Sequence, residues 1–280
     1  MSGTLFIVAT PIGNLEDLTP RARKTLTEVD LIAAEDTRHS GRLLSHIGAK
    51  PRLLALHDYN EQAAAASVIA ILEEGRDVAL VSDAGTPLVS DPGYRLVRAA
   101  HERGITVSPI PGPSALTAAL SVAGLPTDRF GFEGFLPAKR AARRQLLESL
   151  RRETRTTVFY ESVHRVADSL SDMCEILGKE RRAFVGRELT KMYEQCVRGT
   201  LEELCAKIDD GSIVAKGEFV IVVTGTDDES PASSLDTDRL LAELGDVLPA
   251  KVAARVSARV TGLKKNALYQ RLLELREEKH

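Results

Sequence analysis

The sequence contains few cysteines, and none of them forms a metal-binding pattern. Only Cys174, Cys196 and Cys205 occur among 280 residues, and no two of them are spaced as a Cys-x-x-Cys pair. Structural zinc sites need clustered ligands, and odd, unpaired cysteines are typical of reducing compartments. We therefore expect a cytoplasmic protein, and no metal-ligating constellation is visible in the sequence.

Long hydrophobic runs are absent as well. No stretch approaches the ~20 apolar residues that a membrane span needs, so we expect no membrane partner. The first apolar run has no basic region before it and ends at Pro11, which predicts a first strand rather than a signal peptide. No Gly-x-Gly-x-x-Gly follows that strand, and no Gly-Lys-Ser/Thr loop occurs. The sequence therefore lacks the usual motifs of a dinucleotide-binding fold and of a nucleoside-triphosphate-binding loop.

A large excess of positive charge is also missing. The formal net charge is −3, so a nucleic-acid partner would have to bind to local basic patches. Two such patches occur. The run 138–155 carries seven basic residues against two acidic ones, a local charge of +5, with Lys139, Arg140, Arg143, Arg144, Arg151, Arg152 and Arg155. The run 251–265 carries five basic residues and no acidic one, with Lys251, Arg255, Arg259, Lys264 and Lys265.

The stretch Asp77–Gly93 is the most informative part of the chain. Val78–Val81 is a short apolar run that predicts a buried strand, and it ends in the turn-rich segment 82–87. We expect Asp91 to cap a following helix that has Pro92 as its first residue. In open α/β sheets, ligands bind beside such a loop at the carboxyl end of a strand. An ordinary strand-to-helix connection is the alternative.

The first part of the chain predicts five strand–loop–helix units. The predicted strands are Leu5–Ala9, Leu31–Ala34, Leu53–Leu56, Val78–Val81 and Ile105–Ile110. This order predicts a mostly parallel sheet covered on both faces, so the polar loops that follow the strands should meet at one edge. We assign residues 1–118 to this α/β domain.

The pattern changes after Pro126. Strands are predicted at Thr156–Tyr160, Ala183–Val185, Glu194–Val197 and Lys216–Val223, which favours a smaller second α/β domain at 119–226 with more strand pairing. A polar linker, Thr226–Ser234, follows. Residues 235–280 predict three short helices, Leu240–Leu244, Ala250–Thr261 and Lys265–Glu278, with breaks at Gly245 and Gly262. These helices resemble a helix-turn-helix or, alternatively, form a cap with solvated charges.

Seven motifs together resemble one family. They are Thr10-Pro11-Ile12-Gly13-Asn14-Leu15, Ala34-Glu35-Asp36-Thr37-Arg38, Ser82–Pro87 with Asp91-Pro92-Gly93, Pro111–Ala115, Phe132–Pro137, Tyr160-Glu161-Ser162 with His164-Arg165, and Arg187–Lys191. Their order and spacing resemble the bacterial 16S ribosomal RNA cytidine-2′-O-methyltransferases, a branch of the tetrapyrrole-methylase superfamily. The match runs from about Thr4 to Val223, and the basic tail is similar to that family's C-terminal domain.

The resemblance implies a fold, a cofactor and a substrate. It implies two α/β domains of the tetrapyrrole-methylase type, with S-adenosylmethionine (SAM) in the cleft between them, and a homodimer that acts on 16S rRNA or the small ribosomal subunit. The residues that it assigns to SAM are Pro11, Gly13, Asp83, Ala84, Gly85, Thr86, Ser114, Ala115, Tyr160, Leu189, Gly217 and Glu218. The tetrapyrrole branch usually carries Gly-x-Gly-Pro-Gly-Asp after its first strand. Thr10-Pro11-Ile12-Gly13-Asn14 stands there instead, which favours the RNA branch.

Two polar clusters are candidates for substrate positioning or proton transfer. The first is Glu35, Asp36 and Arg38, in which Asp36 is the candidate catalytic residue and a structural Asp36–Arg38 ion pair is the alternative. The second contains Glu188 and Lys191, where a buried lysine with a lowered pKa would accept the hydroxyl proton. The sequence does not choose between them.

Two other functions stay open from the residues alone. One is a methyltransferase for a tetrapyrrole or another small molecule, which would transfer a methyl group without RNA. The other is a non-catalytic RNA-binding protein that keeps the same fold.

Overall fold

The computed structural model describes residues 2–226 and 237–277. Contacts divide the chain into two units, one made of Met1–Arg151 with Arg155–Thr224 and the other of Arg152–Thr154 with Gly225–His280. Apart from Thr226, the predicted linker Thr226–Ser234 lies outside the described residues. No helix in the described part of the chain is long and apolar enough to cross a membrane.

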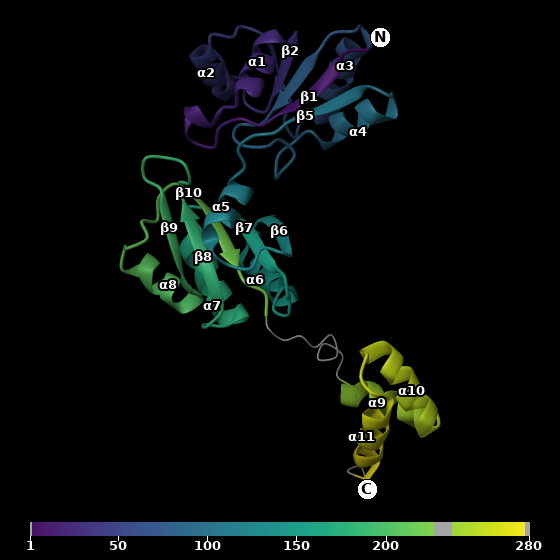
Figure 1. Ribbon diagram of the computed structural model, residues 1–280. Helices are drawn as coiled ribbons and strands as arrows, with labels where there is room; N and C mark the ends of the chain where they lie inside the picture. Colours follow the sequence, from purple (N-terminus) through teal and green to yellow (C-terminus); the bar gives the residue numbers. More distant parts are fainter. Residues whose placement is uncertain (1, 227–236, 278–280) are drawn as a thin grey trace. The chain divides into compact units, whose positions relative to one another are not determined.

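Five parallel strands form the first sheet, in the order β3-β2-β4-β1-β5. Strands β1, β2 and β5 of this sheet are labelled in Figure 1. In chain order they are β1 Thr4–Val8, β2 Leu31–Ala34, β3 Arg52–Ala55, β4 Val78–Val81 and β5 Thr106–Ile110. The helical segments between them are η1 Leu15–Asp17, α1 Pro20–Glu28, α2 Thr37–Ile47, α3 Glu61–Glu73 and α4 Tyr94–Glu102. The predicted parallel sheet is confirmed, with the ends of β1, β3 and β5 shifted by one residue.

Helices cover both faces of this sheet because its central strand is apolar on both sides. Val78 and Leu80 of β4 pack in a core with α3 and α4, whereas Ala79 and Val81 pack in a core with α1 and α2. The helix after β4 therefore lies on one face, and the helices after its neighbours β1 and β2 lie on the other. Such a reversal opens a crevice at the carboxyl ends of the strands, where α/β proteins bind ligands.

The predicted start of α4 is wrong. Gly93 rather than Asp91 is its N-cap residue, with φ of 126°, and it has no side-chain cap of its own. The carboxylate of Glu61 instead accepts hydrogen bonds from the backbone N–H groups of Gly93 (3.1 Å) and Arg95 (2.9 Å). A distant side chain thus satisfies the free amides of the helix, and the carboxyl of Asp91 is left for the loop after β4.

The second sheet is mixed and has the order β6-β7-β10-β8-β9. Its strands are β6 Phe130–Phe135, β7 Thr156–Ser162, β8 Arg182–Arg187, β9 Gln195–Thr200 and β10 Glu218–Val223. Only β6 and β7 pair in parallel among these neighbours. Its helices are α5 Ala115–Ala123, α6 Arg140–Ser149, α7 Val166–Leu177 and α8 Leu201–Asp209. The predicted α/β class and the greater strand pairing are confirmed.

Helix α5 belongs to the second sheet by its contacts. Its buried Ala119 and Ala123 pack with Val158, Phe184 and Val220 on one face of that sheet, and α6, α7 and α8 cover the other face. The predicted boundary at 118/119 falls inside this helix.

Helices α9 Thr237–Val247, α10 Ala250–Thr261 and α11 Lys265–Glu277 follow (Figure 1). They pack around Leu241, Ala253 and Leu268. The predicted break at Gly245 is wrong, because α9 continues to Val247 and a Cβ at Gly245 would lie 2.6 Å from Leu272 Cδ1. The glycine serves close packing there. Gly262, with φ of 73°, does end α10 as predicted.

Candidate active site

The loops after four strands of the first sheet are tied together at one edge. Thr10 and Gly85 exchange backbone hydrogen bonds of 2.9 and 3.0 Å, which joins the loops after β1 and β4. Thr86 Oγ1 donates to the carbonyl of Pro113 in the loop after β5 at 3.0 Å. The N–H of Asp36, after β2, donates to Asp83 Oδ1 at 3.0 Å. The predicted convergence of these loops is confirmed.

Carboxyl groups from three strand ends interact at this edge. Burial, with a smaller contribution from the charges of Asp83 and Asp58, raises the pKa of Asp91 to about 6, although the hydrogen bond with Ser82 acts in the opposite direction. Burial also raises the pKa of Glu35, and the charges of Asp83 and Asp91 add to the effect. The edge therefore has a negative potential that suits a cationic ligand. Asp91 belongs to this group of carboxyls, whereas the sequence analysis assigned it to the helix cap.

Replacing Asp91 with asparagine is expected to stabilise the protein at neutral pH and to change little in acid. The folded-state pKa is about 6 against an ordinary value of 3.8, so between these values the folded protein binds more protons than the unfolded one. Wild-type stability therefore falls as the pH rises through this window, and the Asp91→Asn variant should not show that fall. Urea unfolding should give the variant about 1 kcal/mol more stability near pH 7 and about none near pH 4, after allowance for partial solvent exposure. A less stable variant at neutral pH would contradict this expectation.

Tyr160 of β7, in the second sheet, contacts the N-terminus of α5. The Tyr160 hydroxyl accepts a hydrogen bond of 3.1 Å from the backbone N–H of Leu116, and burial raises the pKa of Tyr160. Phe132 lies edge-on to the ring at 4.9 Å between centroids. Ser114, the N-cap residue of α5, makes no side-chain cap hydrogen bond. The predicted SAM residues Ser114, Ala115 and Tyr160 are therefore brought together.

The β8–β9 loop lies against the loop after β1. A Cβ at Gly13 would fall 2.2 Å from Lys191 Cγ, so the lysine side chain covers this glycine. Lys191 Nζ pairs with Glu188 Oε1 at 2.8 Å and with Glu218 Oε2 at 3.0 Å. A Cβ at Gly217 would lie 2.4 Å from Glu188 Cδ. Leu189 of the same loop is buried and packs in a cluster that includes Ile12. With Leu189, six residues of the predicted site lie in this region, the others being Gly13, Glu188, Lys191, Gly217 and Glu218.

The predicted lowering of the lysine pKa is wrong. Burial acts to lower the pKa of Lys191, but hydrogen bonds with Glu188 and Glu218 outweigh it, and the pKa is raised. Burial acts to raise the pKa of Glu188, but hydrogen bonds from Lys191 and from the N–H of Glu218 lower it overall. Hydrogen bonds with Arg38 lower the pKa of Asp36 to about 2, so the predicted alternative of a structural Asp36–Arg38 ion pair is confirmed. None of these groups is a ready proton acceptor.

Backbone strain is concentrated in the loop after β4 and in the β8–β9 loop. The described non-glycine residues with left-handed backbone are Leu88, Ser90, Glu188 and Thr190, in the β4–α4 and β8–β9 connections. Such conformations persist where the surrounding structure enforces them, commonly at ligand-binding sites. Arg187 supplies part of this support. It is buried, and it donates hydrogen bonds to the carbonyls of Lys216 (2.6 Å) and Tyr193 (2.7 Å).

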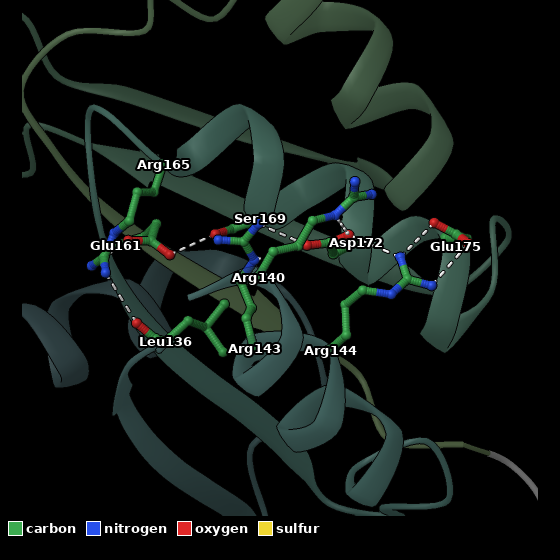
Figure 2. Close-up of polar contacts among 9 residues, drawn as sticks. All are labelled: Leu136, Arg140, Arg143, Arg144, Glu161, Arg165, Ser169, Asp172 and Glu175. Atoms are coloured by element: carbon green, nitrogen blue, oxygen red, sulfur yellow. Dashed lines mark hydrogen bonds and ion pairs between the residues drawn. The ribbon is translucent and has the colours of Figure 1, made fainter. Parts of the chain in front are cut away.

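Three of the seven basic residues in the run at 138–155 pair with acids of α7 inside their own domain, which reduces the free positive charge that the sequence count indicates. Figure 2 shows Arg140, Arg143 and Arg144 converging from α6 on Asp172 of α7, at 2.8 to 3.1 Å. Arg144 also pairs with Glu175 at 2.6 Å. A composition count cannot detect these pairs, because the acids lie about thirty residues further along the chain.

The motif Tyr160-Glu161-Ser162 with Arg165 divides into two roles. Tyr160 faces α5, but Glu161 is buried on the opposite side of the strand, as alternation along a strand requires. It pairs with Arg165 at 2.9 Å and accepts a hydrogen bond from Ser169 Oγ at 2.6 Å (Figure 2). Glu161 and Arg165 are therefore structural.

A hollow of about 150 Å³ opens beside Asp83, between the loops after β1 and β4 and helix α2. Pro11 and Leu15 line it from the loop after β1, and Ser40, Arg42 and Leu43 line it from α2. Among the lining residues named here, only Pro11 and Asp83 belong to the site predicted from the sequence. In the part of the chain that the structure describes, no group of three or more histidine, cysteine or acidic side chains is placed to hold a metal ion.

Comparison with known proteins identifies the class. Residues 4–205 match the family model of the Tetrapyrrole (Corrin/Porphyrin) Methylases, and residues 231–276 match the RsmI C-terminal HTH domain. The chain belongs to the tetrapyrrole methylase family, a family of methyltransferases. The second match favours the helix-turn-helix interpretation of the tail over a plain helical cap.

Individual proteins of known name are similar to this chain over most of its length. The chain is 52% identical over 272 residues to the Ribosomal RNA small subunit methyltransferase I of Escherichia coli O157:H7, covering 97% of this chain and 95% of that protein. The Xylella fastidiosa (strain Temecula1) protein of the same name is 53% identical, with coverage of 95% and 98%. A crystal structure of diphthine synthase matches with a TM-score of 0.59 at 17% identity, covering 80% of this chain and 90% of that one, and so shows the fold alone. The resemblance inferred from the motifs is confirmed.

Proposed function

We propose that the protein transfers a methyl group from SAM to the 2′-hydroxyl of a cytidine ribose in 16S ribosomal RNA. The similarity to ribosomal RNA methyltransferases carries this proposal, since it spans both α/β domains and the C-terminal helices at about half identity. Structural similarity to the tetrapyrrole enzymes stays below 25% identity and supports only the shared fold.

The residues at the sheet edge fit SAM. Its sulfonium and ammonium groups are cationic, and the crowded carboxyl groups of Glu35, Asp83 and Asp91 favour a cation. The start of α5, where Ser114 gives no side-chain cap, suits its carboxylate. When bound, SAM supplies the electrophilic methyl group and leaves as S-adenosylhomocysteine. The residues that would hold it are Pro11, Gly13, Asp83, Ala84, Gly85, Thr86, Ser114, Ala115, Tyr160, Leu189, Gly217 and Glu218.

Positioning dominates the catalytic contribution of this chain. Alignment of reacting groups can supply roughly 7–11 kcal/mol of barrier lowering. Asp36 positions Asp83 through its backbone N–H, and the Glu188–Lys191 pair holds the β8–β9 loop on Gly13.

RNA binding is assigned chiefly to the C-terminal unit. Lys251, Arg255 and Arg259 recur every four residues on α10, and all three are exposed, as are Lys264 and Lys265. Spacing of four residues places side chains on one face of a helix, where they can contact successive phosphates. The partner is the small ribosomal subunit in the cytoplasm, and the active form is a homodimer, as the family resemblance implies.

The test is a methylation assay on unmodified ribosomes. Purified protein is incubated with methyl-labelled SAM and small subunits from a strain that lacks the enzyme, and the labelled nucleoside is identified after digestion of the RNA. Label on a cytidine ribose of 16S RNA is expected. Absence of label from RNA, or transfer to a porphyrinoid in its place, would overturn the proposal.

A further inference from the structure

The hollow beside Asp83 lies next to the proposed methyl-transfer site. Thr10, Pro11, Ser82 and Asp83 line it, and Thr10 is bonded to Gly85 across the loops assigned to SAM. At about 150 Å³ it is smaller than the roughly 300–1,000 Å³ of pockets that enclose a whole drug-sized ligand. It therefore has room for one chemical group rather than for the complete cofactor.

Ser40 marks the polar side of this hollow. Ser40 is only 5% exposed, and its Oγ has no hydrogen-bond partner in the described chain. Buried hydroxyls are normally paired, and an unpaired one costs free energy of folding. A serine at this helical position could otherwise bond to the carbonyl four residues earlier, as Ser45 does to Gly41 at 2.8 Å on the same helix. The unpaired hydroxyl is consistent with a partner that arrives from outside.

Apart from His39, the remaining lining residues are Leu15, Arg42 and Leu43, and these three suit a nucleotide. Pro11, Leu15 and Leu43 present apolar surface from two sides, and Leu15 is 46% exposed. Arg42 is exposed, and its side chain makes no hydrogen bond or ion pair within residues 2–226 and 237–277. Apolar walls accept the faces of a base that has left its stack, and an unpaired guanidinium binds phosphate.

We propose that this hollow receives the base of the nucleotide whose ribose is methylated. Leu15 and Leu43 flank the base, Ser40 Oγ hydrogen-bonds its polar edge, and Arg42 contacts an adjoining phosphate. The assignment rests on the proposed function, because it takes an RNA substrate for granted. The position of the hollow against Asp83 places the sugar of such a nucleotide beside the SAM loops.

Two substitutions test the assignment without disturbing the fold. In Ser40→Ala the lost hydroxyl has no partner among the residues that the structure describes, so the melting temperature should stay the same or rise. The KM for unmodified small subunits should nevertheless rise about tenfold. In Arg42→Gln the same KM should rise about tenfold, and the salt dependence of binding should decrease by a slope of about one. Affinity for SAM, measured by calorimetry, should be unchanged in both.

Two control variants distinguish a loss of base binding in this hollow from the general effects of removing a hydroxyl or a surface charge. Ser45→Ala removes a hydroxyl from the same helix, and Arg52→Gln removes an exposed charge at the opposite end of the strands. Both should keep the wild-type KM. Wild-type KM in the two test variants, a loss of SAM affinity, or a loss of stability in Ser40→Ala would each overturn the pocket assignment. Failure of the wild-type protein to label RNA would instead refute the proposed function itself.

Discussion

Replacing Asp172 with alanine is expected to lower the free energy of unfolding by about 3–5 kcal/mol. The Asp172 side chain is 1% exposed and accepts hydrogen bonds from three arginines of α6 (Figure 2). Arg143 is also buried, at 3% exposure of its side chain, so the substitution leaves a buried guanidinium without its counter-charge. Urea unfolding followed by circular dichroism measures the loss.

A neighbouring acid provides the control. Glu175 pairs with Arg144 in the same network, but its side chain is 59% exposed. Glu175→Ala should therefore cost no more than about 1 kcal/mol, as exposed ion pairs do. Replacing both partners with apolar residues, Arg143→Met with Asp172→Leu, should recover most of the stability lost in Asp172→Ala, because no charge then stays buried. Equal losses for Asp172→Ala and Glu175→Ala would contradict the importance of burial.

The network also shows where sequence reasoning fails. The basic residues of 138–155 are visible as a run, but their acidic partners lie on a different helix. A local count therefore misses that three of the seven basic residues belong to an ion-pair network within the domain. Asp91 is a similar case. Local preference makes an aspartate before proline a good helix cap, yet Glu61, thirty residues earlier, occupies the amides of that helix start.

The fold was predictable because its signals are local and repeated. The continuous apolar run Val78–Val81 can only be buried on both faces, which indicates a central parallel strand. Once the strands are parallel, their carboxyl ends must share an edge, so the meeting of Asp83, Thr86 and Pro113 with the loops after β1 and β2 follows from topology. The direction of the Lys191 pKa shift was not predictable, since it is set by the balance of burial against hydrogen bonds with Glu188 and with Glu218, which lies twenty-seven residues away.

Replacing Gly85 with valine is expected to reduce kcat/KM for methyl transfer by about 100-fold or more, because small displacements in a site that works by alignment have large effects. Gly85 has φ of 82°, which a β-branched residue adopts only with strain, and a Cβ there would lie 3.3 Å from Ile12 Cγ2. The substitution should therefore separate Gly85 from Thr10 and displace the two loops that are assigned to SAM. Calorimetry should show weaker SAM binding alongside the kinetic loss.

Gly211 isolates the effect of the site from the effect of backbone strain. It has φ of 80°, almost the same as Gly85, and no atom of the described residues lies within 4 Å of a Cβ at this position after α8. Gly211→Val should show a similar strain cost of roughly 1–3 kcal/mol in thermal unfolding but should keep wild-type kcat/KM at temperatures where both variants are folded. If the two variants lose activity equally, strain alone explains the loss. If Gly85→Val keeps full activity, the Thr10–Gly85 bridge does not align the reacting groups, and the SAM site must lie elsewhere on the molecule.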